Sequence, residues 1–440
     1  KIFVLPGTEV EGALLAMEVE GFVLRGKFNP GAADTEWCDR RLLARIHRRT
    51  ITRLRAEIEP VSIAAFQRFL LVWQKVQPEN RVQGPDGVQA ILEQLNGYEV
   101  PAAAWEPEVL AIRMKDYSPQ WLDQLCFRGL IGWGRLSLPQ NQTSRPSAPV
   151  RSSPVSLFTR EHLPAWLALS PTTPVPGFTP DTQRVFEDLL YRGARFFGEL
   201  AKLRGLLPSR IEQALAELVA QGWVTSDSFE GLRALLIPQE KRLHYADSAR
   251  KRRHKAITSL EFAGRWSLLR ATNDNHETPT ADEAIETFAR TLLRRYGVVF
   301  RRLLDRESLK VSWFELGRVF RRLEARGEIR GGYFVGGVSG EQFALPEAIG
   351  LLRSIRKQPA SGELITISGV DPLNLSGILT PGPRVSGIAA NRILLKDGEP
   401  IAALEAGHIS MLNGIAQFDR LTERALRIGS MPPPLRPYYA

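Results

Sequence analysis

The chain has 440 residues, of which 43% are hydrophobic and 24% charged, a composition that supports several buried cores and excludes a disordered protein. Its longest strongly apolar stretch, FLLVW at 69–73, falls well short of the ~18 residues needed to span a membrane. A net charge of +10 points toward polyanionic partners, and two cysteines without metal spacing (Cys38 and Cys126) suit a reducing cytoplasm.

The N-terminal stretch GFVLRGKF at 21–28 fits the first seven positions of a phosphate-binding loop. Its intervening residues are bulky, however, and Phe28 stands where a Ser or Thr hydroxyl would hold Mg²⁺. We therefore predict a short strand with a Gly bend and no ATP site in this chain. Because the sequence begins KIFVLPG, without an initiator Met or a signal-peptide pattern, we expect it to be part of a longer protein.

Residues 39–59, 62–77 and 84–97 are predicted to be helices, and three later segments then repeat one pattern. In each, an amphipathic helix stops at a Gly suited to a positive φ, and hairpin strands follow. In the second copy we expect the returning strand to lie before residue 236. The three copies are 121–136, 211–236 and 313–345, with helices stopping at Gly129, Gly222 and Gly327.

Two further helical segments precede each of the last two copies: 181–193 and 196–205, then 281–297 and 299–307. Three helices followed by a hairpin is the winged-helix order, with the hairpin as the wing. Pro208-Ser209 and Ser312 supply start signals for the third helices of these two modules. Winged helices serve as protein adaptors as well as DNA readers, so the fold alone does not decide the function.

Cations around the third helices favour DNA, because phosphate neutralisation supplies most of the affinity for DNA. The candidates are Arg195, Lys202, Arg204 and Arg210 in one module, and Lys310, Arg318, Arg321 and Arg322 in the next. A basic segment, KRLHYADSARKRRHK at 241–255, adds Arg250, Lys251, Arg252 and Arg253, with a solvated loop as its alternative interpretation.

Stretches rich in Pro, Ser and Thr at 140–154 and 170–181 are predicted to be linkers or surface loops, and 272–283 an acidic one. Beyond residue 360 alternating apolar residues predict a small β-rich, barrel-like or sandwich domain, and Asp397-Gly398 predicts a hairpin turn. The fold class is thus mostly α with β wings (α+β). The predicted domains are helical or winged-helix modules at 1–139, a linker with a short helix at 140–181, winged-helix modules at 182–270 and 281–350, and the β-rich domain at 360–440.

Long blocks of the chain resemble the C-terminal region of Lhr, the bacterial large helicase-related DNA helicase of superfamily 2. The resemblance covers most of the chain. It is carried by EWCDRRLLARIHRRT (36–50), EIEPVSIAAFQRFLLVWQ (57–74), LNGYEVPAAAWE (95–106), LLPSRIEQALAELVAQGWVTSDSFEGLRALL (206–236), GRWSLL (264–269), RRLEARGEIRGGYFVGGVSGEQFALPEA (321–348) and DPLNLSGILTPGPRV (371–385).

The resemblance implies tandem winged helices closed by a β-domain, involved in DNA repair and in self-assembly into a homo-oligomer. It also implies that ATP and Mg²⁺ belong to an N-terminal helicase core of the same polypeptide, so that this chain itself needs no cofactor. The region is similar, too, to winged-helix DNA glycosylases of the AlkZ type, which use a Gln-x-Gln or Gln-x-Asp pair to position a water at the sugar.

Within this sequence Asp419, in Gln417-Phe418-Asp419, is the candidate catalytic residue, because a carboxylate can activate water or stabilise a cationic sugar. The alternative is an Asp paired with Arg420 on a helix surface. The QNQ at 140–142 lies in a polar linker, and the six His show no metal-ligand spacing. Three functions therefore stay open: a non-motor DNA-binding region of an Lhr-type helicase, a DNA glycosylase for uracil or alkylated bases, and a protein-binding scaffold.

Overall fold

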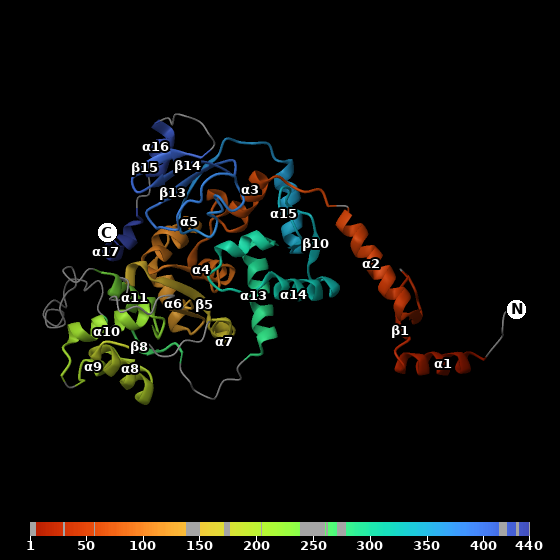
Figure 1. The fold of residues 1–440 in the computed structure, drawn as a ribbon, viewed down its shortest axis with the longest axis horizontal. Helices are drawn as coiled ribbons and strands as arrows, with labels where there is room; N and C mark the ends of the chain where they lie inside the picture. The colour runs from red at the N-terminus through yellow and green to blue at the C-terminus, as the bar shows by residue number, and fades with distance from the viewer. Residues whose placement is uncertain are drawn as a thin grey trace.

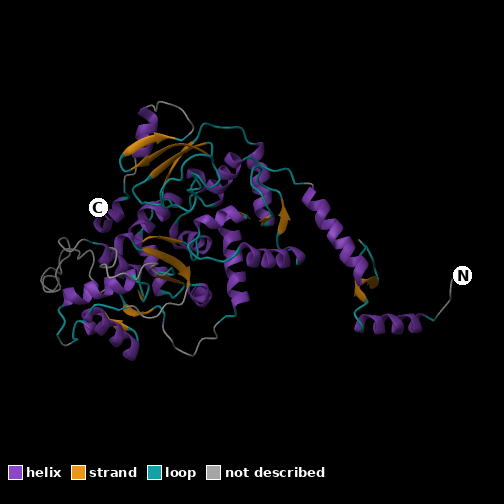
Figure 2. Cartoon of the chain, viewed as in Figure 1, coloured by secondary structure: helices purple, strands orange, loops and turns teal. Residues whose placement is uncertain are grey.

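The computed structural model shows a body of packed helices and small sheets, from which an N-terminal arm projects (Figure 1). It describes residues 6–29, 31–56, 58–137, 150–170, 177–203, 205–237, 260, 263–270, 279–412, 420–427 and 431–439. Figure 2 shows that the strands lie in several small sheets among many helices, which confirms the predicted α+β class. Within the described ranges no helix is both long and apolar enough to cross a bilayer.

The arm consists of two helices joined by a β-hairpin. Its elements are α1 (Gly7–Val19), β1 (Val23–Gly26), β2 (Glu36–Asp39) and α2 (Arg40–Ala56). β1 and β2 pair antiparallel, so the strand predicted inside the phosphate-loop-like stretch is confirmed. No side chain of α1 is buried, because nothing in the body packs on it.

Three parts of the body share one order of elements: a helix, a strand, a short helical turn, a helix and two more strands. The first part contains α4 (Gly84–Gln94), β3 (Glu99–Pro101), η2 (Ala102–Ala104), η3 (Trp105–Leu110), α5 (Ala111–Arg113), α6 (Pro119–Phe127), β4 (Ile131–Gly134) and β5 (Pro154–Thr159). The second contains α8 (Pro180–Arg192), β6 (Arg195–Phe196), α9 (Phe197–Leu200), α10 (Pro208–Ala220), β7 (Val224–Ser226) and β8 (Arg265–Leu268). The third contains α13 (Ala281–Tyr296), β9 (Val298–Val299), η8 (Arg301–Arg306), α14 (Trp313–Ala325), β10 (Arg330–Gly332) and β11 (Gln342–Ala344).

In all three parts the last strand lies in the middle of a three-stranded antiparallel sheet, between the first strand and the second. This is the winged-helix topology, and the tandem repetition predicted from the sequence is confirmed. The third helices α6, α10 and α14 are followed by Gly129, Gly222 and Gly327, with φ of 74°, 80° and 78°. A side chain would strain the backbone at these left-handed positions, so Gly marks the end of each helix.

Two segments differ from the expectation. Residues 229–236, predicted to contain a returning strand, form helix α11 (Phe229–Leu236), and 265–268 provide the strand instead. The helix is favoured because it buries Phe229 and Leu232 and directs Arg233 to a carboxylate of another module. The second segment, 140–181, was predicted to be a linker with a short helix. It contains such a helix, α7 (Leu163–Leu169), which packs against α13, but it also contains β5, which completes the first sheet.

The buried side chains form two large cores that do not follow the chain order. One core joins the first two winged-helix modules. The other joins α3 (Ile63–Trp73) and α15 (Pro346–Lys357) with the third module and the C-terminal sheet. Phe66, Phe69 and Leu70 of α3 are fully buried there, so α3 belongs with elements more than two hundred residues later in the chain.

The C-terminal sheet is an open meander of four antiparallel strands in the order β12-β13-β14-β15. The strands are β12 (Leu364–Ser368), β13 (Arg392–Lys396), β14 (Glu399–Glu405) and β15 (His408–Met411), followed by α16 (Arg420–Arg427), η9 (Pro433–Leu435) and α17 (Arg436–Tyr439). The prediction of a barrel is therefore wrong: four short strands are too few to close on themselves, and α16 packs against them instead. The hairpin predicted at Asp397-Gly398 is confirmed, with both residues at positive φ.

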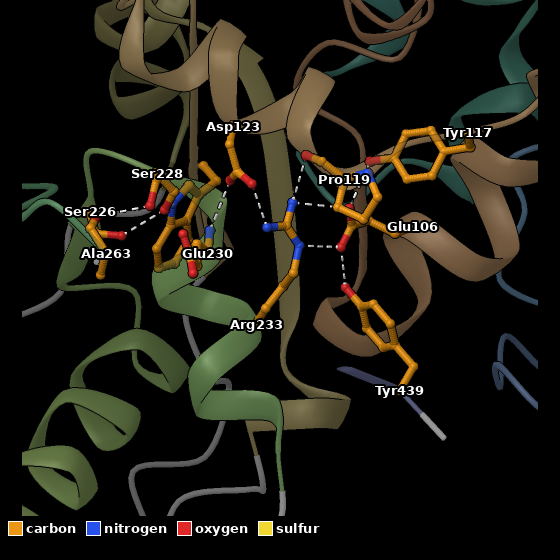
Figure 3. Close-up of polar contacts among 11 residues, drawn as sticks. Glu106, Tyr117, Pro119, Asp123, Ser226, Ser228, Glu230, Arg233, Ala263 and Tyr439 are labelled. Atoms are coloured by element: carbon orange, nitrogen blue, oxygen red, sulfur yellow. Dashed lines mark hydrogen bonds and ion pairs between the residues drawn. The ribbon is translucent and has the colours of Figure 1, made fainter. Parts of the chain in front are cut away.

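A buried polar cluster fastens the first module to the second and to the C-terminal helix α17 (Figure 3). Glu106 accepts hydrogen bonds from the hydroxyls of Tyr117 (2.7 Å) and Tyr439 (2.6 Å) and from the guanidinium of Arg233 (2.6 and 3.1 Å). Arg233 also bonds to the carboxylate of Asp123 (2.6 Å). The buried charges are thus paired and hydrogen-bonded, as burial of an ion requires.

Candidate nucleic-acid interface

The three third helices differ in charge, and this difference selects one of them as a candidate DNA contact. Helix α6 contains no Lys or Arg. Helix α10 contains Arg210 but also two Glu. Helix α14 contains three Arg against two Glu, so among the three it alone has a net positive charge, as neutralisation of phosphates requires.

Helix α14 is held in place by its N-terminal cap and by its buried apolar face. The Ser312 side chain accepts from the Glu315 N–H (3.3 Å), and the Glu315 carboxylate accepts from the Ser312 N–H (3.1 Å). The Ser312 hydroxyl and N–H both donate to the Glu315 carboxylate, and these two bonds, with a smaller contribution from Arg318, lower the pKa of Glu315. On the inner face Leu316, Phe320 and Leu323 are fully buried, so the helix cannot rotate without opening the core.

The outer face of α14 carries one aromatic and three cationic side chains at helical spacing. Phe314 is 72% exposed, and Arg318, Arg321 and Arg322 are exposed on the following turns. Arg321 pairs with Glu341 (2.8 Å) and Arg322 with Glu286 (2.6 Å). Such half-exposed pairs contribute little to stability, so both arginines can exchange a carboxylate for a phosphate at small cost.

The other predicted DNA-binding residues of the described regions lie apart from this face or near its start. Lys310 is exposed just before α14 and donates to the Glu307 carbonyl (2.9 Å). Arg195 is held by Asp188 and Glu199, each at 3.4 Å. Lys202 and Arg210 are exposed, near α9 and at the start of α10. In Figure 1 these two helices lie on the opposite side of the body from α14.

Several predicted site residues lie outside the described residues. Arg204 does, and so does the catalytic candidate Asp419. The basic segment with Arg250, Lys251, Arg252 and Arg253 also does; in the sequence it comes between α11 and β8, the return strand of the second module.

One cationic helix, α2, was not among the DNA-binding elements predicted from the sequence. Helix α2 reads RRLLARIHRRTITRLRA, with seven Arg and no acidic residue. The run of arginines is visible in the sequence and could have signalled a nucleic-acid contact. What the sequence does not show is that this helix stands outside the body (Figure 1).

The chain contains three modules of this topology, and one of them has a cationic, exposed third helix. It is therefore a tandem winged-helix protein. Two family models, both described as Large helicase-related protein, winged-helix domain, match residues 61–155 and 278–364. The chain therefore carries winged-helix domains of the Lhr family, and the resemblance predicted from the sequence is confirmed.

Two relatives that align over most of this chain agree with this assignment. The chain is 30% identical over 438 residues to the "Lhr helicase/ probable uracil glycosylase" of Mycolicibacterium smegmatis, covering 94% of this chain and 28% of that protein. It is 28% identical over 383 residues to the "Lhr helicase/uracil glycosylase" of Escherichia coli, covering 79% of this chain and 24% of that protein. The chain thus spans about a quarter of the length of either relative. Among solved structures it is similar to the Streptomyces sahachiroi DNA glycosylase AlkZ, with 15% identity, a TM-score of 0.46 and coverage of 83% of this chain and 95% of that chain.

Proposed function

We propose that this chain is the non-motor region of an Lhr-type DNA-repair helicase and that it binds DNA through helix α14. The observation that carries the proposal is the exposed, cationic outer face of a third helix in an Lhr winged-helix domain. A third helix in a groove positions its cations on phosphates, and these contacts supply sequence-independent affinity. ATP hydrolysis with Mg²⁺ would then reside in the helicase core of the parent protein.

Replacing Arg318, Arg321 and Arg322 together with Ala is expected to weaken binding to duplex DNA by about tenfold or more. The slope of log K against log salt should flatten by about 0.9 for each phosphate that the variant no longer neutralises. Fluorescence anisotropy at several salt concentrations measures both quantities.

A matched control removes the same charge without touching α14. Arg192, Arg353 and Arg427 are exposed and lie on three other helices, so their joint replacement with Ala should leave the salt slope nearly unchanged. Equal losses of affinity in the two triple variants would assign the effect to net charge and would remove α14 as the DNA-binding helix.

Self-assembly belongs to the same proposal, and the arm supports it. Phe22 (54% exposed), Leu24 (41%), Leu42 (43%) and Ile46 (49%) leave apolar area uncovered in a single copy. The apolar side chains Phe66, Phe69 and Leu70 of α3, by contrast, are fully buried inside the chain and offer nothing to a partner. Light scattering at micromolar concentration tests the homo-oligomer, and a monomeric mass would remove it.

A second candidate function is release of uracil from DNA, favoured by the words "uracil glycosylase" in the names of both relatives. Such an enzyme needs a carboxylate beside a flipped nucleotide. Asp419 is the candidate from the sequence. In the described regions Glu230 is the alternative, because burial, together with the neighbouring Asp123 carboxylate, raises its pKa to about 7.

Two neutral variants separate these carboxyl groups. If Asp419 assists catalysis, Asp419→Asn should reduce base release from a uracil-containing strand by about a hundredfold or more while DNA affinity is kept. Glu230→Gln should then remain active, and the reverse result would move the role to Glu230. No base release by the unsubstituted chain would remove this second function and leave DNA binding in place.

A further inference from the structure

Helix α2 carries a concentration of positive charge unlike any other described helix of the chain. Its seven arginines are Arg40, Arg41, Arg45, Arg48, Arg49, Arg53 and Arg55. All of them are exposed except Arg55, which is partly buried. Like charges placed this close repel one another, so a helix of this composition is stabilised when anions lie along it.

The arginines gather on one side of the helix. Arg41, Arg45, Arg48 and Arg49 follow the spacing i, i+4, i+7 and i+8, which places them on a single face. The face spans more than two turns, so it can meet a row of anions and not only a single one.

The C-terminal end of α2 is fixed to the candidate DNA-binding helix. Arg55 donates two hydrogen bonds to the carboxylate of Glu324 on α14, at 3.1 and 2.6 Å. The same carboxylate accepts from the backbone N–H of Gly331 in β10 (2.9 Å). Figure 1 shows α2 leaving the body beside β10, with β1 and α1 at its far end.

The wing of this module, residues 333–341, is poorly suited to bind phosphates itself. Residues 333–341 contain no Lys or Arg. They are also covered by the segment that follows α2: the Val61 N–H donates to the Phe334 carbonyl, and the Gly336 N–H donates to the Val61 carbonyl, both at 2.8 Å. The segment that covers the wing therefore follows directly after α2 in the chain.

From these contacts we propose that α2 is a second DNA-binding element, whose arginine face lies along the phosphate backbone of a duplex held by α14. The inference rests on the proposed DNA-binding function and adds to it a site outside the winged helix. The helix is about 25 Å long, so it would follow roughly seven base pairs beyond those that α14 covers. Phosphate is the partner favoured by charge, since the arginine face offers cations and no acid to a protein surface.

The test compares two duplexes, one of about 10 and one of about 30 base pairs, of which only the longer extends past α14 along α2. The variant Arg41→Gln, Arg45→Gln, Arg49→Gln should bind the longer duplex about tenfold more weakly, with a salt slope flatter by about 0.9 for each phosphate left without its arginine. Its binding to the shorter duplex should equal that of the unsubstituted chain. The matched variant with Lys at the same three positions keeps the charge, and Gln and Lys have similar helix propensities, so the Lys variant should bind both duplexes normally.

Each outcome decides a different point. Unchanged affinity and slope of the Gln variant on the longer duplex would overturn the inference while the proposed function stands. An equal loss of affinity on both duplexes would overturn the placement of α2 beyond α14. Failure of the unsubstituted chain to bind either duplex would overturn the proposed function and, with it, this inference.

Discussion

Replacing Asp371 with Ala is expected to lower the free energy of unfolding by about 3–5 kcal/mol, because it leaves the guanidinium of Arg113 buried without its counter-charge. Both side chains are completely buried. Arg113 donates to the two carboxylate oxygens of Asp371 at 2.7 and 2.9 Å, and its remaining bonds reach the Val109 carbonyl and the Gln74 side chain. Urea denaturation followed by tryptophan fluorescence measures the change in stability.

The matched control breaks an ion pair of similar length at the surface. Arg290 and Glu328 lie 2.7 Å apart but are 44% and 37% exposed. Glu328→Ala should therefore cost no more than about 1 kcal/mol. Similar losses of stability in the two variants would show that the Arg113–Asp371 pair is not what joins the first module to the C-terminal sheet.

This buried pair also shows why the sequence could not reveal how the modules assemble. Arg113 and Asp371 lie 258 positions apart. Neither lies in a recognisable motif, and a buried ion pair depends on two elements that meet only in the folded chain. Local signals, by contrast, were sufficient to predict where the third helices end. Each ends at a Gly that adopts a positive φ, and this preference belongs to the Gly itself.

The error at residues 229–236 has the same origin. The apolar run is compatible with a strand or a helix when it is read locally. The helix is favoured by a distant contact, because in it Arg233 bonds to Glu106 and Asp123 at once. Tertiary pairing therefore overrides a local pattern that is ambiguous.

For the candidate site, it was easier to predict from the sequence which residues are cationic than which of their side chains are exposed to DNA. The arginines of α14 were selected as cations around the third helix of a winged-helix module, and the structure leaves their side chains exposed. Arg195 was selected on the same grounds, but its side chain is only 23% exposed, against 48% for Arg321 and 42% for Arg322. The arginines of α2 were visible yet unassigned, because whether a helix lies in a core or on an arm depends on the rest of the chain.

Substitution of Gly398 by Ala is expected to cost about 2–5 kcal/mol, through two effects that add. Gly398 has a φ of 82°, where an L side chain costs about 1–2 kcal/mol. The new Cβ would also lie 2.2 Å from the Ala64 carbonyl oxygen and 2.8 Å from the Arg68 nitrogen, both backbone atoms of α3. Because a helix backbone cannot move aside as a flexible side chain can, overpacking adds about 1–3 kcal/mol.

The next hairpin of the same sheet provides the control for this substitution. Gly407 has nearly the same φ, 84°, and follows a residue at positive φ as Gly398 does, but a Cβ there would meet nothing within 4 Å. Gly407→Ala should therefore show only the backbone cost of about 1–2 kcal/mol. The difference between the two variants in urea denaturation measures how tightly the Asp397-Gly398 turn is docked on α3. Equal costs would mean that the turn can withdraw from the helix, and that the C-terminal sheet is held to the body by its other contacts, among them the apolar side chains that it buries in the shared core.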